Sequence, residues 1–186
     1  MTRTLVGAIG YRNLRDHSAA FEVVDRLSGV LPEGEAVIED TSYNPIALVQ
    51  WLDSLEGQDR FDRAILVAAV TRPGRTGGAV DPYHWDGRLP SDELVQQAVT
   101  EAVTGIINLD NTLTIAGYFK ALPAEVIVVE IEPIDHAFGS DFSSPVRRAI
   151  EQACSLIQEL ATDHARAAAF PRRALEVVET LEGRAV

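Results

Sequence analysis

The chain has 186 residues, of which 46% are hydrophobic and 24% are charged, a composition typical of a globular domain with a buried core. Its 28 acidic and 16 basic residues leave a formal net charge of −12, which argues against a binding surface for nucleic acid or for an anionic membrane. The first residues do not resemble a signal peptide, no apolar run approaches the roughly 20 residues of a membrane span, and the single cysteine excludes an internal disulfide. We therefore expect a cytoplasmic protein.

Short apolar runs alternate with helical patterns along most of the chain. Apolar runs bounded by Gly, Pro or polar residues predict buried strands, and apolar residues at helical spacing predict helices between them. Residues 71–90 are rich in Gly and Pro, so we expect a loop there with one short strand at most. The predicted strands cover residues 4–9, 35–39, 63–70 and 125–131, and the predicted helices cover residues 15–30, 46–55, 92–103, 111–122 and 144–161.

Repeated strand–helix units with apolar strands predict an α/β fold, a three-layer sandwich in which a twisted, mostly parallel sheet lies between helices. We expect a single domain over residues 1–163, followed by a helical or partly disordered tail over residues 164–186. In such sheets, ligands bind beyond the carboxyl ends of the strands. That rule directs attention to residues 10–17, 40–44 and 68–76.

Several familiar kinds of site are absent from the sequence. The turn after the first strand, GYRNLRDHSAA, has one glycine where a dinucleotide-binding turn needs G-x-G-x-x-G, and the chain contains no P-loop motif. It also contains no G-x-S-x-G nucleophile elbow. Cys154 falls on the apolar face of the last predicted helix, which is typical of a small buried residue rather than a nucleophile.

Five segments in chain order carry a resemblance to a known family: IGYRNLRDHSAAFEVVDRL, EDTSYNPIALVQWL, RAILVAAVTRPGRTGGAV, LPAEVIVVEIEP and DFSSPVRRAIEQA. They resemble the motifs of the hydrogenase maturation proteases. That family shows G-x-G-N-x-L-x-x-D-[DE]-G-x-G, then D-x-G-T-x-G-x-x-L, then an apolar-x-D-A-V strand with a P-G-T-V-like loop, then L-P-x-x-V-x-V-x-G-I-x-P and L-S-P-x-V-x-x-A. The resemblance covers the chain to about Ala161 and implies a phosphorylase/hydrolase-like α/β fold.

The resemblance implies a metal-dependent endopeptidase that binds the large subunit of a nickel–iron hydrogenase and cleaves its C-terminal extension after nickel is loaded. Its metal ligands would be a carboxylate after the first strand, an Asp at the end of the third strand and a later His. Asp16 matches the first ligand, but Ala68 stands at the second position, and residues 104–123 offer Asp110 and no His. Two of the three expected ligands are therefore not matched. The cofactor is nickel or another divalent metal held by a rearranged set, or there is none.

The candidate residues lie at the predicted binding edge and in the loop beside it. Asp16, Asp110 and His84 form the rearranged metal set, because mixed oxygen and nitrogen ligands suit nickel and zinc. The arginines of the Gly/Pro-rich loop form a local positive patch suited to a carboxylate-bearing peptide. The residues expected to bind the substrate are Asn13, Asp40, Thr41, Arg72 and Arg75.

These candidates also have purely structural interpretations. Asp16 would favour the N-terminal dipole of the first helix, and Asp110 would cap the helix that follows it. Asp40 would belong to an ordinary turn at the end of a strand. Glu130 and Glu132 alternate with apolar residues, so we expect them to face solvent or a loop.

Two functions of different classes follow from the sequence. The first is a hydrogenase maturation protease-like endopeptidase that acts on the C-terminal extension of a nickel–iron hydrogenase large subunit. The second is a pseudoenzyme, a non-catalytic member that binds such a large subunit or a similar client as an assembly chaperone. The complete order of motifs favours the first function, and Ala68 favours the second.

Overall fold

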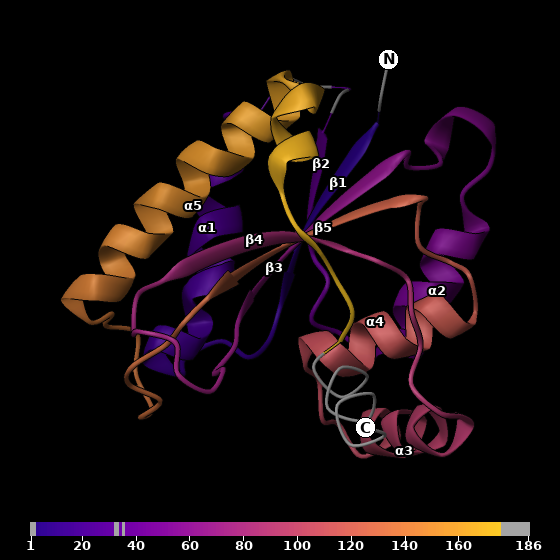
Figure 1. Ribbon diagram of the computed structural model, residues 1–186, viewed down its shortest axis with the longest axis horizontal. Helices are drawn as coiled ribbons and strands as arrows, with labels where there is room; N and C mark the ends of the chain where they lie inside the picture. Colours follow the sequence, from indigo (N-terminus) through magenta and orange to yellow (C-terminus); the bar gives the residue numbers. More distant parts are fainter. Residues whose placement is uncertain (1–2, 32–33, 35, 176–186) are drawn as a thin grey trace.

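The computed structural model describes residues 3–31, 34 and 36–175, and within these residues six strands form one sheet. The strand order is β2-β1-β3-β5-β4-β6, with helices on both faces of the sheet (Figure 1). β1, β2, β3 and β5 are parallel, whereas β4 runs antiparallel to β5 and the short β6 runs parallel to β4. The predicted mostly parallel α/β sandwich is confirmed. The strands are β1 (Thr4–Ile9), β2 (Ala36–Asp40), β3 (Arg63–Ala69), β4 (Val80–Trp85), β5 (Glu125–Ile131) and β6 (Arg172–Arg173).

Two helical layers cover the sheet. Helices α1 and α5 pack side by side on one face, and α2 and α4 lie on the other face, with α3 packed against α4 (Figure 1). Among the described helices, none is both long enough and apolar enough to span a membrane. The helices are η1 (Arg15–Ser18), α1 (Ala19–Leu27), α2 (Pro45–Ser54), η2 (Gly57–Asp59), α3 (Asp92–Val103), α4 (Leu109–Tyr118), α5 (Ser144–Thr162) and η3 (His164–Ala169).

The alternation of side chains along the central strands decides which residues reach the site. Val67 of β3 packs toward α1 and α5, whereas its neighbour Ala68 belongs to the core cluster on the side of α2 and α4. Ala68 is in register with Glu130 of β5. Glu130 follows the alternation of Val128, which also belongs to the cluster on the α2–α4 side. A carboxylate and a methyl group therefore lie next to each other on this face.

Most element boundaries agree with the sequence patterns. β1, α3 and β5 begin and end at the predicted residues, and the Gly/Pro-rich stretch contains the short strand β4. α4 begins at Leu109 rather than at residue 111, because the Oδ1 atom of Asn108 accepts a hydrogen bond from the backbone N–H of Asn111 at 2.8 Å and caps the helix. Asn108, not Asp110, is thus the N-cap.

Residues 164–175 pack against the domain. The backbone N–H groups of His84 and Asp86 donate to the carbonyl oxygens of Pro171 and Arg173, both at 2.9 Å, so the segment covers the edge of β4. Leu175 is fully buried in the cluster on the α2–α4 side. The expected tail therefore contains a 3-10 helix and a short strand, and its residues 176–186 lie outside the described part of the chain.

Candidate functional site

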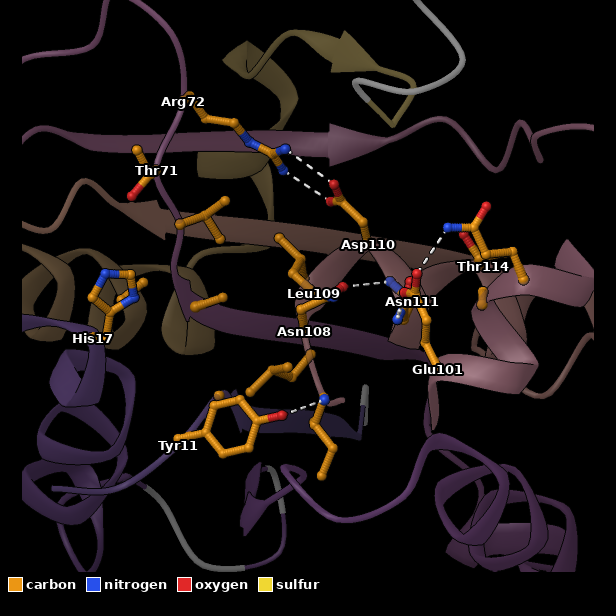
Figure 2. A pocket seen from close by; sticks show the side chains of 18 of the residues that line it. Tyr11, His17, Thr71, Arg72, Glu101, Asn108, Leu109, Asp110, Asn111 and Thr114 are labelled. Atoms are coloured by element: carbon orange, nitrogen blue, oxygen red, sulfur yellow. Dashed lines mark hydrogen bonds and ion pairs between the residues drawn. The ribbon is translucent and has the colours of Figure 1, made fainter. Parts of the chain in front are cut away.

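A cavity of about 540 Å³ opens at the carboxyl ends of β1 and β3, where the topology of a parallel sheet places a binding site. Residues 9–11, 14 and 17 line one side of it, residues 68–70 line its floor, Thr71 and Arg72 form a polar wall, and α3 together with the start of α4 closes the opposite side. Figure 2 shows Tyr11 and His17 coming from the first loop and Asp110, Asn111 and Thr114 coming from α4.

The floor of the cavity is apolar. Ala68, at the end of β3, is 2% exposed and lines the cavity together with Ile9 and Leu109, both fully buried. Ala68 stands where the resemblance expects a ligating Asp, and a methyl group cannot bind a metal. The end of β3 therefore contributes hydrophobic surface to the site instead of charge.

Arg72 occupies the polar wall of the cavity and is held by two carboxylates. Its Nη1 and Nη2 atoms donate to Oδ2 and Oδ1 of Asp110 at 3.0 and 2.9 Å, a bidentate pair that is drawn in Figure 2. Nη2 also donates to Oε1 of Glu130 at 2.7 Å. Burial on its own would lower the pKa of the Arg72 guanidinium, but hydrogen bonds and charge from Asp110 and Glu130 outweigh burial and raise that pKa.

Glu130 is the centre of a buried ionic cluster behind this wall. Its side chain is 1% exposed, it accepts a hydrogen bond from the hydroxyl of Tyr83 at 2.9 Å, and its Oε2 lies 2.7 Å from Nη1 of Arg75. Burial would raise the pKa of the Glu130 carboxyl, yet the hydrogen bonds and charges of Arg72 and Arg75 leave it below its usual value. For Tyr83, burial and then the charge of Glu130 raise the pKa of the phenol.

The surrounding residues extend this cluster to the edge of the sheet. Oε2 of Glu132 accepts a hydrogen bond from the backbone N–H of Arg72 at 3.0 Å, and Asp81 pairs with Arg75 at 3.1 Å and with Arg173 of β6 at 2.6 Å. Of the predicted surroundings of Glu130 and Glu132, solvent or a loop, the structure shows the loop: both are buried because arginines from the Gly/Pro-rich loop pack over them. Of the two arginines predicted to bind the substrate, Arg72 lines the cavity, whereas Arg75 lies behind the wall, bound to carboxylates.

Asp16 does not line the cavity. Its side chain is fully buried, and its carboxylate accepts backbone hydrogen bonds from Ile134 at 3.1 Å, Asp135 at 2.9 Å and Ser143 at 2.8 Å. The 3-10 turn η1 directs Asp16 toward the loop between β5 and α5, whereas the next residue, His17, reaches the cavity. Asp16 therefore fixes that loop in place.

The three residues of the predicted metal set are not brought together. Asp16 binds the β5–α5 loop, Asp110 pairs with Arg72, and His84 lies in β4 with its Nε2 atom 2.8 Å from the carbonyl oxygen of Ala167. Within residues 3–31, 34 and 36–175, no group of three or more His, Cys, Asp or Glu side chains has the geometry to hold a metal ion. The donor groups of the described residues do not fit a three-ligand nickel or zinc site.

The other predicted binding residues lie outside the cavity lining. The carbonyl oxygen of Asn13 accepts a hydrogen bond from the backbone N–H of Gly139 at 2.8 Å, and the side chain of Asn13 has no contact with the pocket. Asp40 pairs with Arg12 at 3.3 Å. Thr41 is fully buried, and its hydroxyl donates to the carbonyl oxygen of Ala8 at 2.9 Å. Asn13 thus links the first loop to the β5–α5 loop, and Asp40 and Thr41 fasten the end of β2 to its neighbours.

Sequence reasoning missed two residues that shape the cavity. The hydroxyl of Tyr11 donates to the carbonyl oxygen of Gly105 at 2.8 Å and accepts from the backbone N–H of Ile107 at 2.7 Å, which links the first loop to the α3–α4 loop. His17 faces the cavity, and burial followed by the nearby His136 lowers the pKa of its imidazole. No local sequence pattern reveals either role, because each depends on which distant loop lies opposite.

Comparison with solved structures identifies proteins that share this fold. Neither a protein-family model nor a curated protein sequence matches the chain. Among solved structures, a hydrogenase 2 maturation peptidase from a Thaumarchaeota archaeon is 24% identical and superposes with a TM-score of 0.58, covering 85% of this chain and 97% of its own. The hydrogenase maturating endopeptidase HybD from E. coli is 19% identical with a TM-score of 0.60, covering 84% of this chain and 90% of its own.

A third structure agrees with these two. The [NiFe] hydrogenase maturation protease HycI from Thermococcus kodakarensis is 16% identical and has a TM-score of 0.64, covering 87% of this chain and 94% of its own. At these identities the likeness concerns the fold, and it matches the expectation from the five sequence segments. The chain has the fold of the hydrogenase maturation proteases.

Proposed function

We propose that this chain is a client-binding protein that keeps the fold of a maturation protease and acts by association rather than by metal-dependent cleavage. The observation that carries the proposal is the chemistry of the cavity. Its floor ends in Ala68, the carboxylate of Asp110 in its wall is neutralised by Arg72, and Asp16 points away from it toward backbone N–H groups of the β5–α5 loop. A cavity of this kind is suited to binding.

The resemblance suggests which client to test first. Proteins with this fold are named as maturation peptidases of hydrogenases, and the sequence motifs resemble those of enzymes that act on the large subunit of a nickel–iron hydrogenase. The proposed client is therefore the C-terminal segment of such a large subunit or of a similar protein. The segment would bind at the cavity and remain intact.

The test measures association and cleavage in the same sample. A peptide of the C-terminal extension of a nickel–iron hydrogenase large subunit from the same organism is titrated into the protein by calorimetry, with and without added nickel or zinc. Its intact mass is then followed by mass spectrometry. We expect association without any change in mass. Cleavage of the peptide, or the lack of any association, would contradict the proposal.

A pair of variants on one helix separates binding in the cavity from binding elsewhere. Leu94 of α3 lines the cavity, so Leu94→Trp fills its mouth. Val103 lies at the end of the same helix, is exposed and does not line the cavity, so Val103→Trp adds the same side chain outside it. We expect Leu94→Trp to weaken the association at least about ten-fold and Val103→Trp to leave it unchanged.

A further inference from the structure

The lining of the cavity also points to the kind of group that it receives. We infer that the cavity takes an uncharged, apolar side chain presented by an extended segment of the client protein. This inference rests on the proposed client-binding function and specifies the substrate class of the same site. It is carried by three observations: the apolar interior, the internal pairing of the charged lining residues, and the exposed apolar residues at the mouth.

The interior is predominantly apolar and large enough for a bulky side chain. The volume of about 540 Å³ lies within the range in which proteins hold ligands. A side chain such as Leu or Phe would exchange water for contact with carbon atoms on several sides of the cavity. The apolar lining comes from β1, β3, α3 and the segment that leads into α4, and includes Ile9, Ala68, Leu94, Ala98, Ile107 and Leu109.

The charged side chains of the described lining are already engaged with protein partners. Arg72 and Asp110 form a bidentate pair with each other, and Arg72 also binds Glu130. The carboxylate of Glu101 accepts hydrogen bonds from the side-chain amides of Asn111 and Gln97, at 2.8 and 2.9 Å. An anionic ligand group would lose its hydration without gaining a partner of opposite charge, and a cationic group would have to compete with the amides of Asn111 and Gln97 for Glu101. An anionic group would in addition meet the net negative charge of the protein.

The mouth of the cavity favours a protein segment over a small molecule. Tyr11 lines the cavity and is 42% exposed, and Ile106, next to the lining residue Ile107, is 46% exposed. Exposed apolar residues beside a cavity offer contacts to the residues that flank an inserted side chain.

The experiment varies one side chain in an otherwise constant peptide. Acetylated and amidated heptapeptides of sequence GSAXASG, with Leu, Phe, Lys or Glu at X, are titrated into the full-length 15N-labelled protein, and the amide signals of the cavity are followed by NMR. We expect the Leu and Phe peptides to bind at least about ten-fold more tightly than the Lys and Glu peptides. We expect Leu94→Trp to abolish this binding and Val103→Trp to retain it.

Each other result overturns the inference in an identifiable way. Equal or tighter binding of the Lys or Glu peptide would show that the cavity selects a charged group. N-acetyl-leucinamide binding as tightly as the Leu peptide would assign the cavity to a small molecule. If no peptide of the series shifts the cavity signals while the hydrogenase peptide still binds, the inference fails and the proposed function stands. If neither binds, both fail.

Discussion

Replacing Asp16 by alanine tests whether this carboxylate holds the fold together or serves chemistry. The carboxylate accepts hydrogen bonds from three backbone N–H groups, those of Ile134, Asp135 and Ser143. Removing it leaves three donors without their acceptor in a partly buried site. Each such donor costs about 1–3 kcal/mol, so we expect Asp16→Ala to lower the free energy of unfolding by about 3 kcal/mol or more. That is a large share of the roughly 5–15 kcal/mol typical of a single domain.

The assay is urea unfolding followed by circular dichroism, combined with hydrogen exchange of the β5–α5 loop. We expect the unfolding midpoint to fall and the amides of Asp135 and Ser143 to exchange faster. Asp16→Asn keeps one acceptor oxygen, so its loss should be smaller than that of Asp16→Ala. Asp53 is exposed on α2, and Asp53→Ala serves as the matched control with no expected change.

Two outcomes would refute this reasoning. A loss below about 1 kcal/mol for Asp16→Ala, with unchanged exchange in the loop, would mean that the three hydrogen bonds contribute little to stability. Loss of a bound divalent metal in Asp16→Asn, with an unchanged free energy of unfolding, would identify Asp16 as a ligand instead. Metal content measured on both variants decides between these interpretations.

Three further predictions concern the cavity and its polar wall. Glu130→Gln breaks the buried pairs with Arg72, so we expect a loss of about 3–5 kcal/mol in urea unfolding. The folded-state pKa of Glu130 is lowered, so its stabilising contribution is present above its unfolded pKa and is lost as pH falls through the folded pKa. The loss of stability in Glu130→Gln should therefore shrink in acid. A loss that does not depend on pH would contradict this. Ala68→Asp buries a carboxyl group, and burial should raise the pKa of that group. The thermal midpoint of the variant should therefore fall further below that of the wild type as the pH rises from 5 to 8. Equal midpoints at pH 8 would contradict the apolar character of the floor. Tyr11→Phe removes the two hydrogen bonds that join the first loop to the α3–α4 loop. The amide of Ile107 should then exchange faster, while the free energy of unfolding falls by about 1–2 kcal/mol at most. Unchanged exchange at Ile107 would contradict a connection between these loops through Tyr11.

The fold was predictable from local patterns because its strands are continuous apolar runs. β1 and β5 are buried on both faces, so most of their residues are apolar. The ends of such an apolar run mark the ends of the strand. α3 could be predicted because its apolar residues recur at helical spacing after Ser91. The five motif segments then indicated the fold of the hydrogenase maturation proteases, which the superpositions confirm.

The site was far less predictable, because its chemistry depends on pairs that are distant in the sequence. Glu130 has the alternation of a solvent-facing residue, and nothing near it reveals that Arg72, 58 residues earlier, covers it. Asp16 stands at the position of a ligand in the motif, yet the 3-10 turn directs it into the β5–α5 loop and His17 toward the cavity. Local sequence patterns indicate the helices and strands. The partners of a site residue depend instead on which distant loops come into contact in the folded chain.

The place of β4 in the sheet has a consequence for the order in which the molecule is completed. β4 lies between β5 and β6, and both of these neighbours follow it in the chain. During synthesis from the N-terminus, β4 must therefore wait unpaired until β5 has emerged, and its outer edge stays open until Arg172 and Arg173 have been added. The pairing of Arg173 with Asp81 is then among the last contacts to form. A nascent chain that stalled before Pro171 would expose the unpaired edge of β4 to other chains. The segment from Pro171 to Arg173 therefore protects the domain against misassembly by covering that edge.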